Sequence, residues 1–523
     1  MSLSRRMFLG SSAAALAAEL FAGPKDSNTP NPALEKLADT ALREAKKLKA
    51  SYCDIRINRY RDQSIAARLT PERGTSKTNE VPTISDNESF GFGVRVIVDG
   101  AWGFAASPVV TAAEIARMTA EAVTVAKANA SIKTKPVVLA PVKAYRDRWT
   151  SPFERNPFEV PIQEKLSLLF DVGREIKKHT RVFSSNATLD FHSEDKYFAS
   201  SEGSSIQQLI IQTFGTAQAT AVDLQRRLSK TRSHIPTPLA TGYEFIPTMN
   251  LVENGRRIRE EVVEHLMAPP VKAGKKDLVL MPSHLFLTIH ESVGHPTELD
   301  RALGYEANFA GTSYITPDKL GKARIASEHV NIYGDRTTER ALATVAYDDD
   351  GVKTTKFPII SKGIFTGYQT IRDQAHLIGE KESRGCCYAD SWASVPFQRM
   401  PNVSMEPGPQ DSTLDDLIGG VEDGILIEGR GSYSIDQQRY NFQFGGDAFW
   451  EIKGGKKRGM IAQVAYQART PDFWQSCDAV AGPSYWQMYG TARDGKGEPI
   501  QVNSISHGCS PARFRQVNVI VTD

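Results

Sequence analysis

Apolar and polar residues alternate most clearly between residues 88 and 107. The alternating apolar residues are Phe90, Phe92, Val94, Val96 and Val98. They lead to Asp99-Gly100, a dipeptide that favours tight turns, and a second apolar strand follows. A period of two up to such a turn predicts a β-hairpin in this part of the chain.

The rest of the first half predicts a mixture of strands and helices. Residues 51–70 have the composition of a strand, and several β-rich segments follow between 181 and 222. Helices are expected over 31–49, 111–130 and 161–179, and Asn31-Pro32 and Thr111 are suited to begin the first two. We therefore predict an α+β fold in which helices pack on a largely antiparallel sheet.

A second, β-rich domain is expected after a charged helix at 248–268. The Pro- and Gly-containing stretch 268–276 is typical of a linker. A short buried strand follows at 277–281, and Pro282-Ser283 ends that strand and caps a helix. The later strands are predicted at 341–347, 357–370, 440–453, 460–466 and 514–521. The predicted organisation is a signal and linker (1–30), an amino-terminal α+β domain (31–268) and a carboxy-terminal domain (269–523).

Composition agrees with two large globular domains and argues against some functions. The chain has 523 residues, of which 40% are hydrophobic and 24% charged. Because 63 Lys and Arg residues nearly balance 61 Asp and Glu residues, no strong field directs the protein to nucleic acid. Five cysteines are too few for a disulfide scaffold, and the odd number leaves at least one without an intrachain partner.

The first two dozen residues resemble a twin-arginine export signal. Arg5-Arg6 is followed by Phe8 and then by an Ala-rich run that is too short to span a bilayer. The resemblance implies export in the folded state to the periplasm, with cleavage near Ala22. No later apolar run is long enough for a transmembrane helix, so we expect no stable membrane insertion after the signal is removed.

The segment His290-Glu-Ser-Val-Gly-His295 places two imidazoles and a carboxylate in an apolar helix. In the familiar zinc helix the histidines are four apart, which is about 40° around the helix axis. A spacing of five gives about 140°, too far for both rings to reach one ion on a regular helix. We therefore predict that the helix widens by one residue, as in a π-bulge, or breaks after Gly294, and Pro296 favours a helix end there.

Glu291 has the position that a general base needs. It follows His290 directly, so it would lie beside a metal ion rather than bind it, and it could take a proton from an activated water. The less specific interpretation is that these side chains are solvated or hydrogen-bonded in the core.

The histidine helix followed by Pro-Thr-Glu-Leu-Asp300 resembles the signature of the TldD/PmbA family of metallopeptidases, in its TldD branch. Three other segments resemble the same family, at 91–96, 400–408 and 506–515. The resemblance implies a zinc (Zn²⁺) site in the carboxy-terminal domain, flexible or unfolded peptide substrates, and a dimer, formed either with a second copy or with a PmbA-like partner.

The chain departs from the family at the third zinc ligand. Family members carry a cysteine in a Cys-Gly-Lys-Gly-Gln-Pro context, and the matching stretch here begins with Asp494. Asp494 could bind through oxygen, or Cys509 could supply a thiolate instead. His507 could donate to a substrate or make a structural hydrogen bond.

Three functions remain open from the sequence. The first is a zinc peptidase that uses Glu291, His290 and His295. The second is a non-catalytic, peptide-binding partner subunit of the same family, which the departure at Asp494 makes conceivable. The third is a metal hydrolase that acts on a non-peptide amide.

Overall fold

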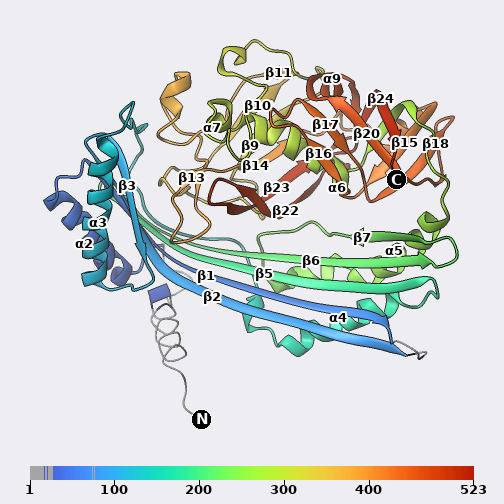
Figure 1. The fold of residues 1–523 in the computed structure, drawn as a ribbon, viewed down its shortest axis with the longest axis horizontal. Helices are drawn as coiled ribbons and strands as arrows, with labels where there is room; N and C mark the ends of the chain where they lie inside the picture. Colours follow the sequence, from blue (N-terminus) through green and yellow to red (C-terminus); the bar gives the residue numbers. More distant parts are fainter. Residues whose placement is uncertain (1–16, 18–19, 22–27, 73–74, 76, 523) are drawn as a thin grey trace.

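A long, curved sheet lies along one side of the molecule, and a β-rich body with short helices lies on it (Figure 1). The computed structural model describes residues 28–522 except 73, 74 and 76, together with residues 17, 20 and 21. Arg5 and Arg6 of the expected export signal lie outside the described residues. None of the helices in the described part is both long and apolar enough to cross a membrane.

The long sheet comes from the first half of the chain. Its strands are β1 (Tyr52–Pro71), β2 (Thr78–Val98), β3 (Ala101–Ser107), β4 (Arg146–Thr150), β5 (Val182–Ser200), β6 (Ser205–Asp223) and β7 (Leu228–His234). Their order is β3-β2-β1-β5-β6-β4, with β7 also paired to β6, and only the β4–β6 pair is parallel. The predicted hairpin is present, because β2 and β3 are joined by Asp99 and Gly100, both at positive φ.

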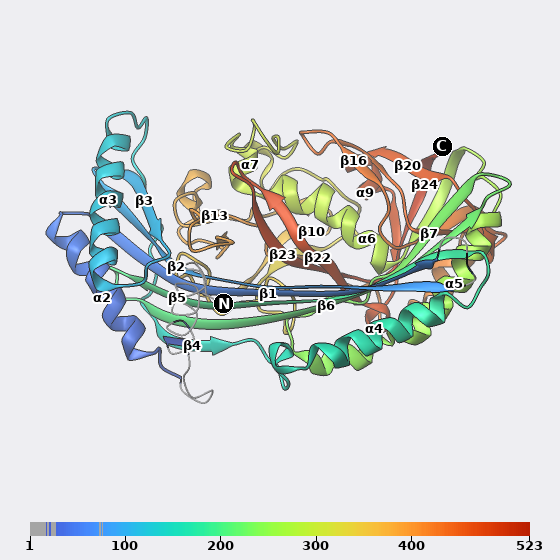
Figure 2. The same cartoon turned by 60° about the horizontal axis from the view of Figure 1, so that its bottom comes forward.

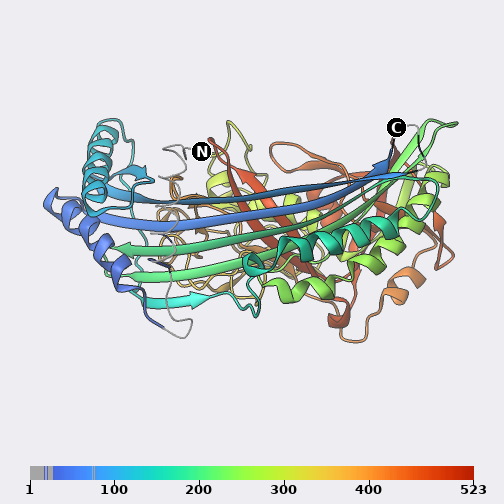
Figure 3. The same cartoon turned by 90° about the horizontal axis from the view of Figure 1, so that it is seen from below.

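Two pairs of helices cover different ends of this sheet (Figures 2 and 3). The four helices are α2 (Pro32–Lys47), α3 (Ala112–Ala130), α4 (Ile162–Ile176) and α5 (Leu251–Met267). The Asn31 side chain accepts from the Ala33 amide and the Thr111 hydroxyl accepts from the Glu114 amide, so both predicted N-caps are confirmed. α2 and α3 pack on the end of the sheet around Ile55, and α4 and α5 pack on its other end around Ile65.

The second half of the chain contains a large mixed sheet, a smaller sheet and two separate hairpins. The large sheet is formed by β8 (Gly274–Leu280), β15 (Asp423–Glu428), β16 (Tyr433–Ile435), β17 (Asn441–Phe444), β18 (Ala448–Lys453), β19 (Lys456–Met460), β20 (Val464–Arg469), β21 (Cys477–Val480) and β24 (Ala512–Val521). Its order is β16-β17-β20-β24-β8-β15-β18-β19, with β21 also paired to β24. Only β8 and β15 run parallel to each other in this sheet, and the strand order places β8 near its middle.

A smaller sheet, two hairpins and short helices complete the second half of the chain. The smaller sheet contains β9 (Ile332–Asp335), β10 (Lys356–Ser361), β11 (Ile364–Phe365) and β14 (Asn402–Met405). The hairpins are β12 (Cys387–Tyr388) with β13 (Phe397–Gln398) and β22 (Gln487–Lys496) with β23 (Gln501–Cys509). The helices are α6 (Pro282–Ile289), α7 (Leu299–Ala302), α8 (Leu414–Gly419) and α9 (Thr470–Gln475). The 3₁₀ turns lie at Pro157–Glu159, Tyr243–Met249, His295–Thr297, Pro317–Lys319, Ala375–Ile378 and Pro483–Tyr485. The predicted α+β class, with a β-rich second half that carries the histidine helix, is thus confirmed.

Several predicted details are wrong. The expected strand 440–453 is two strands, β17 and β18, and the expected strand 460–466 joins the end of β19 to the start of β20. Residues 341–347 form no strand, because their buried backbone bonds to side chains instead: the Leu342 amide donates to Ser506 Oγ and the Ala343 amide to Asn402 Oδ1, each at 3.0 Å. The segment 357–370 is interrupted by a turn at 362–363, where both residues have positive φ. Ser283 does not cap α6: the N-cap is Met281, and Ser283 Oγ accepts from the Gly429 amide.

Buried ion pairs join the long sheet to the body above it. Arg95 Nη2 lies 2.7 Å from Asp54 Oδ2 in the neighbouring strand and 2.8 Å from Asp350 Oδ1 in the second half of the chain. Arg232 on β7 pairs with Glu428 and with Asp447, both at 2.6 Å. The contact with Glu428, the last residue of β15, anchors the sheet next to the loop that follows this strand and forms part of the candidate site.

Candidate metal centre

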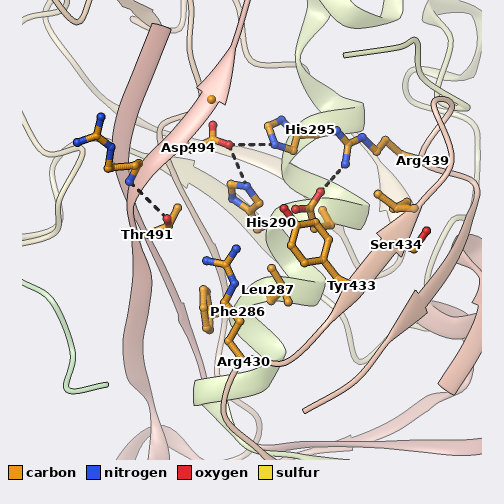
Figure 4. A pocket seen from close by; sticks show the side chains of 14 residues that line it. Phe286, Leu287, His290, His295, Arg430, Tyr433, Ser434, Arg439, Thr491 and Asp494 are labelled. Atoms are coloured by element: carbon orange, nitrogen blue, oxygen red, sulfur yellow. Dashed lines mark hydrogen bonds and ion pairs between the residues drawn. The ribbon is translucent and has the colours of Figure 1, made fainter. Parts of the chain in front are cut away.

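A local change of helix type brings the two histidines together. α6 ends at Ile289 and continues as a single π-helical turn over His290–Gly294, in which the His295 amide donates to the His290 carbonyl. The extra residue in this turn places both imidazoles on the same side, with ring centres 4.6 Å apart (Figure 4). The predicted π-bulge is present, and the 3₁₀ turn that begins at His295 ends the helix.

Gly294 lies directly against the side chain of Met400. A Cβ atom at position 294 would lie 2.6 Å from the Met400 sulfur and 2.8 Å from its methyl carbon. Met400 is fully buried, so it has little room to move away. A larger residue at position 294 would therefore require the Met400 side chain or the π-turn to shift.

Asp494 extends from β22 toward both imidazoles (Figure 4). Its Oδ1 lies 3.3 Å from His290 Nε2 and 3.4 Å from His295 Nε2. The pairing of β22 with β23 shifts register between Thr491 and Asp494, and such a bulge redirects side chains, as is common next to active sites. The other carboxylate oxygen accepts a hydrogen bond of 2.9 Å from Arg399 Nη2, so Oδ1 remains directed at the histidines.

Hydrogen bonds fix the tautomer of His290. His507 Nδ1 lies 2.7 Å from the Val403 carbonyl, which can only accept, so the proton of a neutral His507 ring is on Nδ1. Its Nε2 then accepts from His290 Nδ1 at 2.9 Å, which leaves the lone pair of His290 on Nε2, the atom that faces Asp494. Burial, with the neighbouring His290, holds the pKa of His507 well below its usual range, so this ring stays neutral.

His295 is oriented in the same way by a carboxylate. Its Nδ1 lies 2.9 Å from Glu298 Oε2, which leaves Nε2 directed at Asp494. Burial alone would raise the pKa of Glu298, but the Lys496 ammonium 3.1 Å away and the imidazole outweigh burial and keep this pKa far below its usual range. A carboxylate or carbonyl behind each metal-binding imidazole is the usual support of a zinc site.

These residues fit a tetrahedral zinc ion. Ligand bonds of 2.0–2.1 Å in a tetrahedron place neighbouring donor atoms about 3.4 Å apart. The separations of 3.3 and 3.4 Å from Asp494 Oδ1 to the two imidazole nitrogens match that value. All three ligand atoms lie within 4.8 Å of one another, and two nitrogens with one carboxylate oxygen are a donor set that zinc accepts.

Glu291 lies beside the three donors and is held by an arginine. It is buried, lines the same cavity and forms an ion pair with Arg439 Nη1 (Figure 4). Arg439 lies in the turn between β16 and β17 and has a positive φ of 63°. Burial lowers the pKa of Arg439 despite the opposing charge of Glu291.

The donors open into a cavity of about 610 Å³, large enough for several residues of an extended peptide. Its lining residues are Phe286, Leu287, His290, Glu291, His295, Arg430, Tyr433, Ser434, Ile435, Arg439, Thr491, Arg493, Asp494 and Gly495. The cavity lies between the histidine helix, the β16–β17 hairpin and β22 (Figure 4).

Cys509 lies away from this group. Its Sγ is 4.0 Å from the Pro282 carbonyl at the beginning of α6, whereas the histidines follow the end of that helix. Complete burial raises the pKa of its thiol, which disfavours the thiolate that a metal requires. Of the two alternatives for a third ligand, Asp494 is the one that the fold brings to the histidines.

Sequence reasoning missed most of the residues that support the site. Arg399, Arg439 and Lys496 were not identified as parts of it. Glu298 was visible only as part of the family-like segment after His295. The His290–His507 contact spans 217 residues, a separation over which local sequence patterns give no signal.

Two models of one family match the chain. The model described as the PmbA/TldA metallopeptidase C-terminal domain matches residues 273–520, and the model described as PmbA/TldA metallopeptidase domain 1 matches residues 53–126. Together these ranges cover more than half of the chain, and the first contains His290, His295 and Asp494.

Individual relatives agree with these matches. A metalloprotease of Methanocaldococcus jannaschii is 27% identical over 457 residues, which cover 86% of this chain and 94% of the relative. A zinc metalloprotease TldD homologue of Saccharolobus solfataricus is 25% identical over 400 residues, covering 74% and 79% respectively. The crystal structure of TldE from Thermococcus kodakarensis superposes with a TM-score of 0.68 at 19% identity, covering 93% of this chain and 99% of that one, which shows a shared fold.

Proposed function

Because the chain belongs to the PmbA/TldD family of metallopeptidases, we propose that it is a zinc peptidase of the TldD branch whose metal is held by His290, His295 and Asp494. The observation that carries this proposal is the separation of Asp494 Oδ1 from the two imidazole nitrogens, 3.3 and 3.4 Å, which matches the spacing of donor atoms around a tetrahedral zinc ion. His507 and Glu298 support it, since their contacts with Nδ1 of the two imidazoles leave both Nε2 atoms free to bind. Asp494 takes the place of the cysteine expected in the family.

Glu291 supplies the proton transfers of the proposed reaction. Zinc, when bound, supplies a Lewis acid that polarises a peptide carbonyl and makes water nucleophilic near neutral pH. Glu291 accepts a proton from the attacking water and then gives it to the nitrogen of the leaving amine. The C–N bond breaks, and one carboxylate and one amine are formed. Arg439 holds the Glu291 carboxylate in place between these two transfers.

The substrate proposed is a flexible or unfolded peptide. The metal donors and Glu291 are buried where they line the cavity, so a folded protein surface could not bring a backbone carbonyl to them. We propose that the enzyme acts as a dimer, with a second copy or with a PmbA-like partner, and that the Arg5-Arg6 segment directs its export to the periplasm.

Metal analysis and peptide cleavage test the proposal together. We expect about one zinc per chain in the purified protein, lost in His290→Ala. We expect Glu291→Gln to retain zinc but to cleave unstructured peptides about 10²- to 10⁴-fold more slowly, the usual contribution of a general base. Unchanged cleavage in Glu291→Gln would overturn the assigned role. Peptide binding with neither zinc nor turnover would point instead to a non-catalytic partner subunit, and cleavage of cell-wall amides alone to a non-peptide substrate.

A further inference from the structure

Two arginines in the wall of the cavity are not used by the chemistry proposed above. Arg430 lies in the loop between β15 and β16, and Arg493 lies in the bulge of β22. Both line the cavity together with the metal donors. Figure 4 shows the guanidinium of Arg430 pointing into the cavity beside Phe286 and Leu287.

The acidic residues of the cavity are already paired. Glu291 is bound by Arg439, and Asp494 faces the two imidazoles and accepts from Arg399. Within the described part of the chain, neither Arg430 nor Arg493 forms an ion pair with a carboxylate. The cavity therefore presents two guanidinium groups that have no carboxylate at ion-pair distance, and Asp190 lies near enough to Arg493 for the two charges to interact.

Hydrogen bonds of Gly429 hold the backbone next to Arg430, so the point from which the Arg430 side chain extends is fixed. The Gly429 amide donates to Ser283 Oγ at 3.0 Å, and the Gly429 carbonyl accepts from His284 Nδ1 at 2.9 Å. Both anchors lie in the first turn of α6, the helix that leads to the metal donors. Burial lowers the pKa of His284 to about 4, so this ring is neutral and its hydrogen bonds hold the loop over a wide pH range.

Neighbouring apolar groups favour a flat carboxylate over a hydrated ion. The Arg430 guanidinium carbon lies 5.5 Å from the centre of the Tyr433 ring, and Phe286 and Leu287 line the adjacent wall. An arginine held beside a ring offers parallel N–H groups that match the two oxygens of a carboxylate. Tyr433, Phe286 and Leu287 would then contact the carbon atoms next to the carboxylate.

We infer that Arg430 and Arg493 select peptides that carry a carboxylate close to the scissile bond. This inference rests on the proposed peptidase function and adds the substrate class to it. The carboxylate has two possible sources, an aspartate or glutamate side chain and the carboxy-terminal group of the peptide. The first makes the enzyme selective for acidic sequences, and the second makes it act near peptide ends.

Peptide binding to the zinc-loaded Glu291→Gln protein tests the inference without requiring turnover. Fluorescently labelled peptides are compared in two pairs: glutamate against glutamine at one position, and a free carboxy terminus against its amide. We expect the charged member of at least one pair to bind about three- to tenfold more tightly, as befits ion pairs at a partly exposed rim, and the difference to shrink in high salt. The pair that shows the difference identifies the source of the carboxylate.

Arginine variants assign the preference to the two residues. In the same background, Arg430→Gln and Arg493→Gln are each expected to reduce the preference, and the double variant to abolish it. Arg430→Lys keeps the charge and should keep part of the preference, so it tests the role of Arg430 even if Arg430→Gln does not fold. Arg458→Gln is the matched control, because Arg458 is an exposed arginine on β19, at the other edge of the large sheet from β16.

Equal binding of both members in both pairs, or a preference that survives in the double variant, would overturn the inference. Its failure is separable from failure of the proposed function. Cleavage of neutral and acidic peptides at the same rate refutes only the selectivity. An arginine-dependent preference in a protein that never cleaves a peptide refutes only the peptidase.

Discussion

The Nδ1 atom of His290 lies 2.9 Å from the Nε2 atom of His507, and this contact determines which nitrogen of His290 faces Asp494. His507 itself is fixed by the Val403 carbonyl, so a buried chain of hydrogen bonds runs from the β14 backbone to the metal donors. The hypothesis of a structural hydrogen bond for His507 is therefore supported by its geometry, and a substrate contact is not needed to explain it.

Replacing His507 should weaken zinc binding without removing a donor. In His507→Ala, the Nδ1 of His290 loses its acceptor and the ring can rotate or change tautomer, so we expect zinc affinity to fall about 10- to 100-fold. Competition with a fluorescent chelator measures this. His507→Gln, which retains an acceptor oxygen, should recover part of the affinity. The exposed residue His376 provides a control, since His376→Ala should leave affinity unchanged. Wild-type affinity in His507→Ala would show that the contact does not orient the ligand.

Two substitutions decide whether Asp494 or Cys509 is the third metal ligand. Asp494→Ala removes one of the three donors and leaves Arg399 without its carboxylate, so we expect zinc to be lost at chelator concentrations that the wild type tolerates. Cys509→Ser should retain full zinc content, because its sulfur lies against the Pro282 carbonyl. Metal analysis after dialysis compares the two proteins. The opposite result, zinc lost only in Cys509→Ser, would assign the third ligand to the thiolate.

Asp494→Cys addresses the departure from the family pattern. A thiolate at this position would give the two-histidine, one-cysteine donor set that family resemblance implies, and zinc binds it well. We expect this variant to retain zinc and, with cobalt in place of zinc, to show the intense near-ultraviolet absorption of a thiolate ligand. If the cobalt protein lacks that absorption, position 494 does not contact the metal.

Arg439 should affect turnover more than metal binding. Its guanidinium pairs with Glu291 but not with the zinc donors, so Arg439→Gln leaves a buried carboxylate free to adopt other rotamers. We expect kcat to fall about 10- to 100-fold, within the contribution of a positioned general base, while zinc content stays at one per chain. Arg439→Lys should be less impaired because it keeps a positive charge near Glu291. A variant that loses zinc would show that the ion pair supports the helix itself.

Local sequence patterns predicted helices and the hairpin well, because backbone groups there form hydrogen bonds with other backbone groups nearby in the sequence. Asn31 and Thr111 begin their helices as expected, and Asp99-Gly100 joins the predicted hairpin. The run 341–347 failed because an apolar, buried segment can satisfy its backbone through distant side chains such as Asn402 and Ser506. Nothing within the run distinguishes that arrangement from a strand.

For the site, the sequence predicted the chemistry but not its support. A spacing of five between His290 and His295 requires an extra residue in the turn, and the π-turn supplies it. Asp494 could be proposed only through the family resemblance, since it lies about two hundred residues further along the chain. Arg399 lies between β13 and β14 and bonds to Asp494, and Lys496 at the end of β22 bonds to Glu298 behind His295; only the fold brings these groups together. The boundary at residues 268 and 269 stays a prediction.

The stability of the long sheet should depend on pH through His192. Its Nδ1 lies 2.7 Å from Asp62 Oδ1 and its Nε2 lies 3.1 Å from Glu194 Oε1. Burial by itself lowers the pKa of His192, but the two carboxylates outweigh it and raise this pKa to about 9. Because the folded pKa exceeds the unfolded value of about 6.5, the folded state binds the proton more tightly. The stabilisation is therefore complete below about pH 6.5 and is lost as pH rises through about 9.

Thermal unfolding of the wild type and of His192→Gln between pH 6 and pH 10 measures this contribution. We expect the wild type to lose about 1–2 kcal/mol more than the variant over that range, less than the full pKa shift would give, because the ring is partly exposed. Lys196 and Tyr388 contact Glu194 in both proteins and so cancel in the comparison. The exposed residue His376 again serves as control, since His376→Gln should follow the wild type. Parallel curves for the wild type and His192→Gln would mean that the pKa of His192 is the same in the folded and unfolded states, and that the two carboxylates do not hold its proton.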